Sequence, residues 1–102
     1  MQSIARVRHE GRPYEAYIVT RSQHSVGSSG GGFGGPDHYV AIVLVQPGAT
    51  FSGTEPLNAG RLQARGIQII QMGEYYGKSA GPRSRYREVM DDADDWIRRH
   101  RA

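Results

Sequence analysis

The sequence contains no cysteine, which excludes disulfide bonds, thiolate metal sites and cysteine nucleophiles. It also lacks an apolar run of the roughly 20 residues that a membrane-spanning helix needs. Lysine is nearly absent, because twelve of the thirteen basic residues are arginine. No leader peptide or lipidation motif is visible at the start of the chain, so we expect a cytoplasmic protein without membrane contact.

The 102 residues, 1–102, suffice for a single domain with one small core. The net charge is +3 and is unevenly distributed, since residues 88–102 carry three basic against five acidic side chains. The planar guanidinium of arginine suits phosphate and carboxylate groups. A GC-rich genome explains the preference for arginine more simply, so the charge permits polyanion binding without requiring it.

Residues 3–20 have the pattern of a β-hairpin. A Glu-Gly pair at positions 10 and 11 supplies a two-residue turn, and glycine readily adopts the positive φ that such turns require. Opposed residue numbers then sum to 21, which places Arg6 opposite Glu15 as a cross-strand ion pair.

Two further strands are expected at residues 39–45 and 67–72, both rich in β-branched side chains and apolar towards both faces of a sheet. The first is the longest apolar run and reads as the central strand. Residues 22–36, which connect the hairpin to it, are rich in glycine and serine and predict a flexible loop.

Two helices complete the predicted fold. A short helix is expected at about residues 55–65, with Thr54 as its N-cap and Gly66 at its end. Residues 82–100 form an amphipathic helix whose apolar positions recur with helical spacing at Tyr86, Val89, Met90, Ala93, Trp96 and Ile97. This order predicts an α+β two-layer sandwich, in which one sheet of about four strands packs against one helical layer. The second face of the sheet would then be uncovered, which suggests self-association or obligate docking.

The segment after residues 67–72 ends Gly77-Lys78-Ser79 and is reminiscent of a phosphate-binding loop. Such a loop needs four residues between its glycines, whereas only three separate Gly73 from Gly77. The following Ala-Gly-Pro also prevents a helix from starting at the lysine. We therefore reject nucleotide hydrolysis.

Basic and aromatic side chains nevertheless cluster around the predicted start of the C-terminal helix. A helix N-terminus favours anions, and tyrosine rings can stack on bases. An equally good interpretation is that one tyrosine packs in the core and the arginines lie on a solvated helix start. The predicted partner- or anion-binding residues are Tyr75, Tyr76, Lys78, Ser79, Arg83, Arg85 and Arg87.

The same helix carries an acidic cluster, formed by Asp91, Asp92, Asp94 and Asp95. It is a candidate contact face for a basic partner, although most such runs are simply solvated. The histidines show no metal-ligand spacing, and no metal or cofactor is predicted. Asp37 and His38 could form a hydrolytic triad with a serine of the loop, but no strained nucleophile turn supports this interpretation.

These features predict a small non-catalytic binding protein. It would dock its basic Tyr/Arg-rich surface onto nucleic acid, or onto a protein complex that handles nucleic acid, as an accessory or inhibitory factor. Small size and contrasting charge patches suggest a phage-type anti-defence protein, such as an anti-CRISPR-like inhibitor. The alternative is a homodimeric structural or assembly module without a nucleic-acid role. A hydrolase that uses Asp37 and His38 is the least favoured possibility.

Overall fold

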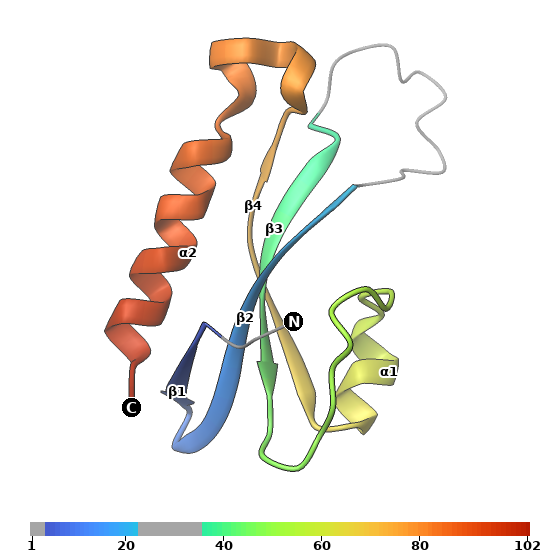
Figure 1. Cartoon of the computed structure of the whole chain (residues 1–102), viewed down its shortest axis with the longest axis vertical. Helices are drawn as coiled ribbons and strands as arrows, with labels where there is room; N and C mark the ends of the chain where they lie inside the picture. Colours follow the sequence, from blue (N-terminus) through green and yellow to red (C-terminus); the bar gives the residue numbers. More distant parts are fainter. Residues whose placement is uncertain (1–3, 23–35) are drawn as a thin grey trace.

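The computed structural model describes residues 4–22 and 36–102, without the side chains of residues 78–80. The elements follow in the order β1 (Ala5–His9), β2 (Arg12–Ser22), β3 (His38–Val45), α1 (Ala59–Ala64), β4 (Ile67–Tyr75), the 3-10 helix η1 (Lys78–Ser84) and α2 (Tyr86–His100). The strands form one antiparallel sheet in the order β1-β2-β3-β4 (Figure 1). The predicted α+β class is thus confirmed, whereas the glycine-rich loop predicted at residues 22–36 lies almost entirely outside the described residues.

The N-terminal hairpin has the predicted register. Arg6 lies opposite Glu15, and its Nε is 3.3 Å from the glutamate carboxylate. Both residues of the turn adopt positive φ, 51° at Glu10 and 78° at Gly11. A two-residue hairpin turn of this kind matches the natural twist of the strands, which is why the local sequence fixes the pairing.

β3 is the central strand, paired with β2 on one side and β4 on the other. Its residues 40–45 are all buried. Because successive side chains point to opposite faces, β3 contributes to two separate cores. Val40, Ile42 and Leu44 belong to the first core, and Ala41, Val43 and Val45 belong to the second core.

The two helices lie on opposite faces of the sheet (Figure 1), and not in one layer as the sequence pattern predicted. Val89, Ala93 and Ile97 of α2 pack against one face. Leu62 of α1 packs with Phe51 against the other. Apolar periodicity shows that a helix has a buried side, but it does not show which face of the sheet that side covers. Both faces of β3 are therefore covered, and an uncovered face no longer supports self-association.

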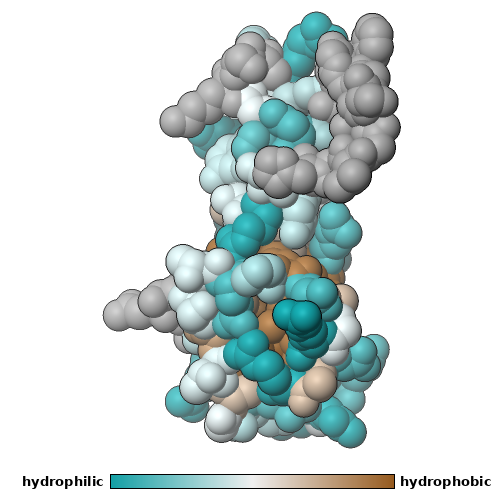
Figure 2. Space-filling model, turned by 90° about the vertical axis from the view of Figure 1, so that its right-hand side faces the viewer, coloured by the Kyte–Doolittle hydropathy of each residue, from teal (hydrophilic) through white to brown (hydrophobic). Residues whose placement is uncertain are grey.

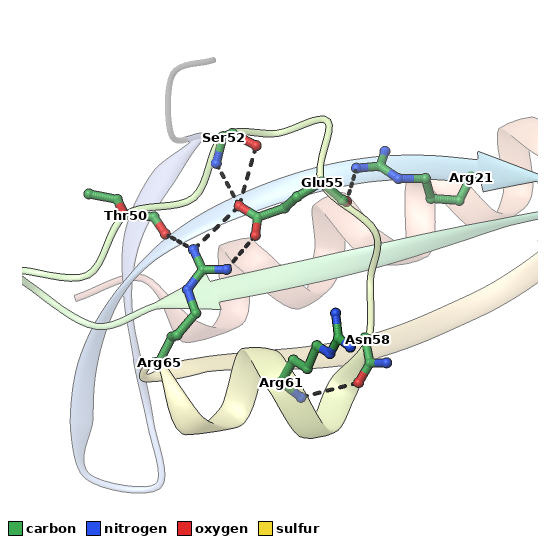
Figure 3. Close-up of polar contacts among 7 residues, drawn as sticks. All are labelled: Arg21, Thr50, Ser52, Glu55, Asn58, Arg61 and Arg65. Atoms are coloured by element: carbon green, nitrogen blue, oxygen red, sulfur yellow. Dashed lines mark hydrogen bonds and ion pairs between the residues drawn. The ribbon is translucent and has the colours of Figure 1, made fainter.

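Segment 46–58 carries the chain across the sheet to the α1 face and is held there by polar contacts (Figure 3). The Glu55 carboxylate accepts hydrogen bonds from Arg65 and from the backbone N–H of Ser52, the latter at 2.9 Å. Arg65 also donates to the carbonyl of Thr50 at 2.7 Å. The hydrogen bonds that Glu55 accepts from Arg65 and, second, from Ser52 lower its pKa to about 2. The segment is thereby fixed over the second core.

α1 starts later than predicted. Its N-cap is Asn58, whose side chain accepts the N–H of Arg61 at 3.1 Å, and not Thr54. The residues before Asn58 are engaged in the Glu55 contacts and cross the sheet as an irregular segment. Gly66 follows the helix with a φ of 80°, in the left-handed region that ends helices.

α2 also starts later than predicted, at Tyr86 in place of residue 82. Gly81 and Arg85 have φ values of 58° and 65°, which interrupt a continuous helix and set η1 apart from α2.

β4 extends beyond residue 72 to Tyr75. It does so through a bulge, since Val40 and Ala41 of β3 oppose Gly73 and Gln71, with one extra residue between them.

Candidate functional site

A pocket of about 440 Å³ lies at one end of the molecule, where β3 begins, β4 ends and α2 begins. We call this end, comprising residues 36–38 and 74–87, the head; it is uppermost in Figure 1. The pocket is lined by aromatic and small polar residues, namely Thr20, His38, Tyr75, Tyr76, Gly77, Ser84 and Tyr86. Aromatic walls with a few polar groups are typical of ligand sites, which span roughly 300–1,000 Å³.

Asp37 ties the start of β3 to the segment that follows β4. Its Oδ1 accepts hydrogen bonds from His38 Nδ1 at 2.8 Å and from the backbone N–H of Gly77 at 2.9 Å. Both bonds favour the carboxylate and lower the pKa of Asp37, the His38 bond more strongly. With Nδ1 held by the carboxylate, Nε2 is the nitrogen of His38 that remains to meet a ligand.

Gly77 makes this contact possible by its lack of a side chain. A Cβ at this position would lie 3.0 Å from Cε1 of His38 and 3.3 Å from Oδ2 of Asp37. Its φ of −66° is available to every residue, so backbone conformation does not explain the glycine. The close approach of the His38 ring explains why this position is a glycine.

The aromatic residues of the pocket support one another. His38 stacks on Tyr75 with centroids 5.2 Å apart, and Tyr86 meets Tyr75 edge-on at 4.9 Å. Tyr75 is only 9% exposed, and its burial raises its pKa. Tyr86 is 43% exposed. Tyr75 therefore forms a wall of the pocket, whereas Tyr86 presents an open aromatic surface.

Ser84 fixes the remaining side of the pocket. Its hydroxyl donates to the carbonyl of Tyr76 at 2.6 Å, and its carbonyl accepts the N–H of Tyr76 at 2.9 Å. This pair of bonds folds the segment after β4 back upon itself and holds Tyr76 at the pocket.

The predicted basic and aromatic residues are only partly brought together. Tyr75 and Tyr76 line the pocket. Arg83, Arg85 and Arg87 are exposed and alternate in sequence with the pocket residues Ser84 and Tyr86. The side chains of the other two predicted residues, Lys78 and Ser79, lie outside the described part of the chain.

Five pocket residues were not recognised as members of this site from the sequence. His38 and Gly77 were considered only in the hydrolytic triad and the phosphate-binding loop. Thr20 and Ser84 carry no local signal, because distant elements bring them to the pocket. Tyr86 was predicted as an apolar position of α2, and its half-exposed ring was not foreseen. The serines considered as partners of Asp37 and His38, namely Ser25, Ser28 and Ser29, lie outside the described residues. The hydroxyl of Ser84 donates to the carbonyl of Tyr76.

The acidic cluster is exposed along α2, on the side away from its buried residues Val89, Ala93 and Ile97. Its last member, Asp95, pairs with Arg98 one turn later.

Within residues 4–22 and 36–102, no three acidic or histidine side chains lie close enough together to hold a metal ion. None of the helices described here is long and apolar enough to span a membrane.

Comparison with protein-family models, curated proteins and solved structures gave no match.

Proposed function

We propose that the protein is a non-catalytic binding protein whose head docks on single-stranded nucleic acid. The observation that carries the proposal is an aromatic pocket whose lining residues alternate with exposed arginines over residues 83–87. Unpaired bases are recognised by stacking on aromatic side chains, while arginine binds the neighbouring phosphates. Such a protein would serve as an accessory or inhibitory factor for a complex that handles nucleic acid.

The concave shape of the site favours a single strand over a duplex. Bases in a duplex are stacked within the helix, whereas an unpaired base can turn outward and enter a pocket. Tyr86 offers a half-exposed ring at this site, and His38 offers its Nε2. One base in the pocket would leave its flanking phosphates beside the arginines of the same segment.

The charges of the head predict a modest affinity. Arg83 and Arg87 form no ion pair within the described residues. Arg85 forms one with Glu88, with its Nε 3.0 Å from the carboxylate. Two to three arginine–phosphate contacts correspond to a salt slope of about −1.4 to −2.1, since each contact to a single strand contributes about −0.7.

The proposal is tested by fluorescence anisotropy with a short labelled single-stranded RNA. In the double variant Arg83→Ala, Arg87→Ala, the slope of log K against log salt should become shallower by about 1.4. The control is Arg61→Ala, Arg99→Ala, which removes two exposed arginines away from the head and so makes the same change in net charge. Tyr86→Ala should weaken binding by about 1–3 kcal/mol, the usual contribution of one stacked base.

Equal losses from the two double variants would mean that binding follows net charge and not the head, and the proposal would be abandoned. The same holds if the wild-type protein binds no single strand at low salt. If, in that case, a nucleic-acid-handling protein complex is captured from host lysate after nuclease treatment, the head docks on protein and not on nucleic acid.

A further inference from the structure

The two edges of the sheet differ in how they are protected. β1, at one edge, has five residues and carries Arg6 and Arg8. Its outer side is occupied by the end of the chain, because the N–H of Ala102 donates to the carbonyl of Arg6 at 3.1 Å and Val7 forms a bridge with Arg101 (Figure 1). Charged side chains and a covering segment are two ways by which proteins keep an edge strand from pairing further.

β4, at the other edge, has nine residues and contains no proline, lysine or arginine. Its one carboxylate, Glu74, comes near the end. The bulge between Gln71 and Gly73 disturbs only its upper part and leaves residues 67–71 as a regular strand. A long regular edge without charge or proline is a template for another strand.

The backbone groups that face outward on β4 follow from the pairing pattern. In an antiparallel ladder, hydrogen-bonded and non-bonded pairs alternate, and the pair that closes a two-residue turn is bonded. The alternation can be followed from the turn at residues 10 and 11 across each pair of strands to β4. It places the backbone N–H and carbonyl groups of Gln68 and Ile70 on the side of β4 that faces β3. The N–H and carbonyl groups of Ile67, Ile69 and Gln71 then point outward. None of these three makes a backbone hydrogen bond to another segment of the described chain.

We propose that β4 pairs antiparallel with β4 of a second copy, which joins the four strands of each copy into one continuous sheet. A two-fold axis through such a pair requires opposed residues to face the same side, so their numbers sum to an even value. The register centred on Ile69 meets this condition with the three outward residues. Ile69 then lies opposite Ile69 of the partner subunit, and Ile67 opposite Gln71 of the partner subunit.

This register fits the side chains of β4 as well as its backbone. Glu74 falls beyond the paired stretch, so the pairing opposes no like charges. Ile69 is only partly buried in one copy and lies at the margin of the second core. Figure 2 shows apolar surface on the face of the sheet that carries α1, surrounded by polar side chains. Pairing would cover Ile69 with the same residue of the second copy, an apolar contact that no charged partner strand would offer.

The inference does not depend on the proposed function. Antiparallel pairing would place the two heads at opposite ends of the joined sheet, because Tyr75 lies at the end of each β4. Both heads would remain accessible to a ligand. Loss of pairing and loss of ligand binding can therefore be observed separately.

The test is the mass of the full chain in solution, measured by light scattering and sedimentation over a wide range of protein concentrations. We expect twice the 11.3 kDa of one chain. Gln71→Pro removes an outward N–H that β3 does not use, so it should give a folded monomer. Gln71→Ala retains that N–H and should stay dimeric. Circular dichroism establishes that each variant is folded.

Amide hydrogen exchange supplies a second measurement that needs no variant. In the dimer, the amides of Ile69 and Gln71 should be protected to the same degree as the inward amide of Ile70. A wild-type chain that remains monomeric at high concentration would overturn the inference. So would a folded Gln71→Pro variant that is still dimeric, or rapid exchange of both outward amides in a dimeric sample.

Discussion

Replacing Gly77 by alanine should disturb the head specifically. The added Cβ would lie 3.0 Å from Cε1 of His38, which is tighter than nine in ten Cβ contacts in folded proteins. The histidine ring must give way by a few tenths of an ångström, which strains the hydrogen bond from its Nδ1 to Asp37. The φ of −66° is compatible with alanine, so the cost arises from the contact and not from the backbone.

The magnitude follows from the position of the contact. Adding a methyl group to a packed site costs about 1–3 kcal/mol, and the exposed side of the His38 ring places Gly77→Ala near the lower limit. In a domain of this size, 1 kcal/mol corresponds to a shift of about 4–8 °C in Tm. Urea unfolding followed by the fluorescence of Trp96, the one tryptophan, measures this loss from the far end of α2.

A double-mutant cycle isolates the contact. With His38→Ala as the background, Gly77→Ala should lose most of its cost, because the ring is no longer there to be displaced. Gly60→Ala is the matched control, since a Cβ at that helical position would meet only Asn58 Oδ1 at 3.7 Å. That variant should gain about 0.5–1 kcal/mol of stability. An unchanged cost of Gly77→Ala in the His38→Ala background would refute the reasoning.

Three further predictions concern the fold. The contacts of Glu55 stabilise the protein fully above its ordinary pKa of 4.5 and are lost as the pH falls towards 2, so Glu55→Gln should flatten the unfolding free energy over that pH range; an unchanged pH profile would contradict this. Asn58→Ala should cost about 0.5–2 kcal/mol in urea unfolding, because it removes the cap of α1, and Asn58→Asp should retain most of it. Ile42→Val, at a fully buried site on β3, should lower stability by about 0.5–1.5 kcal/mol by thermal unfolding, and a stabilised variant would show that the first core is overpacked.

The features predicted well from the sequence are those that depend on neighbouring residues. The turn at residues 10 and 11 sets the register of the hairpin, and the β-branched run at residues 39–45 identifies the central strand. The spacing of apolar residues finds α2 in the same way. In each case the local preference and the final fold agree.

The features predicted poorly depend on contacts between distant elements. The opposite placement of α1 and α2 results from the course of segment 46–58, which Glu55 and Arg65 fix after the chain has folded. The pocket depends on Thr20, His38 and Ser84 meeting across three elements. No spacing in the sequence indicates that these three residues meet. Asp37 with His38, and Tyr75 with Tyr76, were noted only as separate candidates.

We propose that the head binds a single strand through its own arginines and aromatic pocket. The most direct test of this binding is the salt dependence of single-stranded RNA binding, measured by anisotropy for the wild type and for the Arg83→Ala, Arg87→Ala variant. We predict a wild-type slope of about −1.4 to −2.1 that becomes shallower by about 1.4 in the variant. Identical slopes for the two proteins would contradict the account.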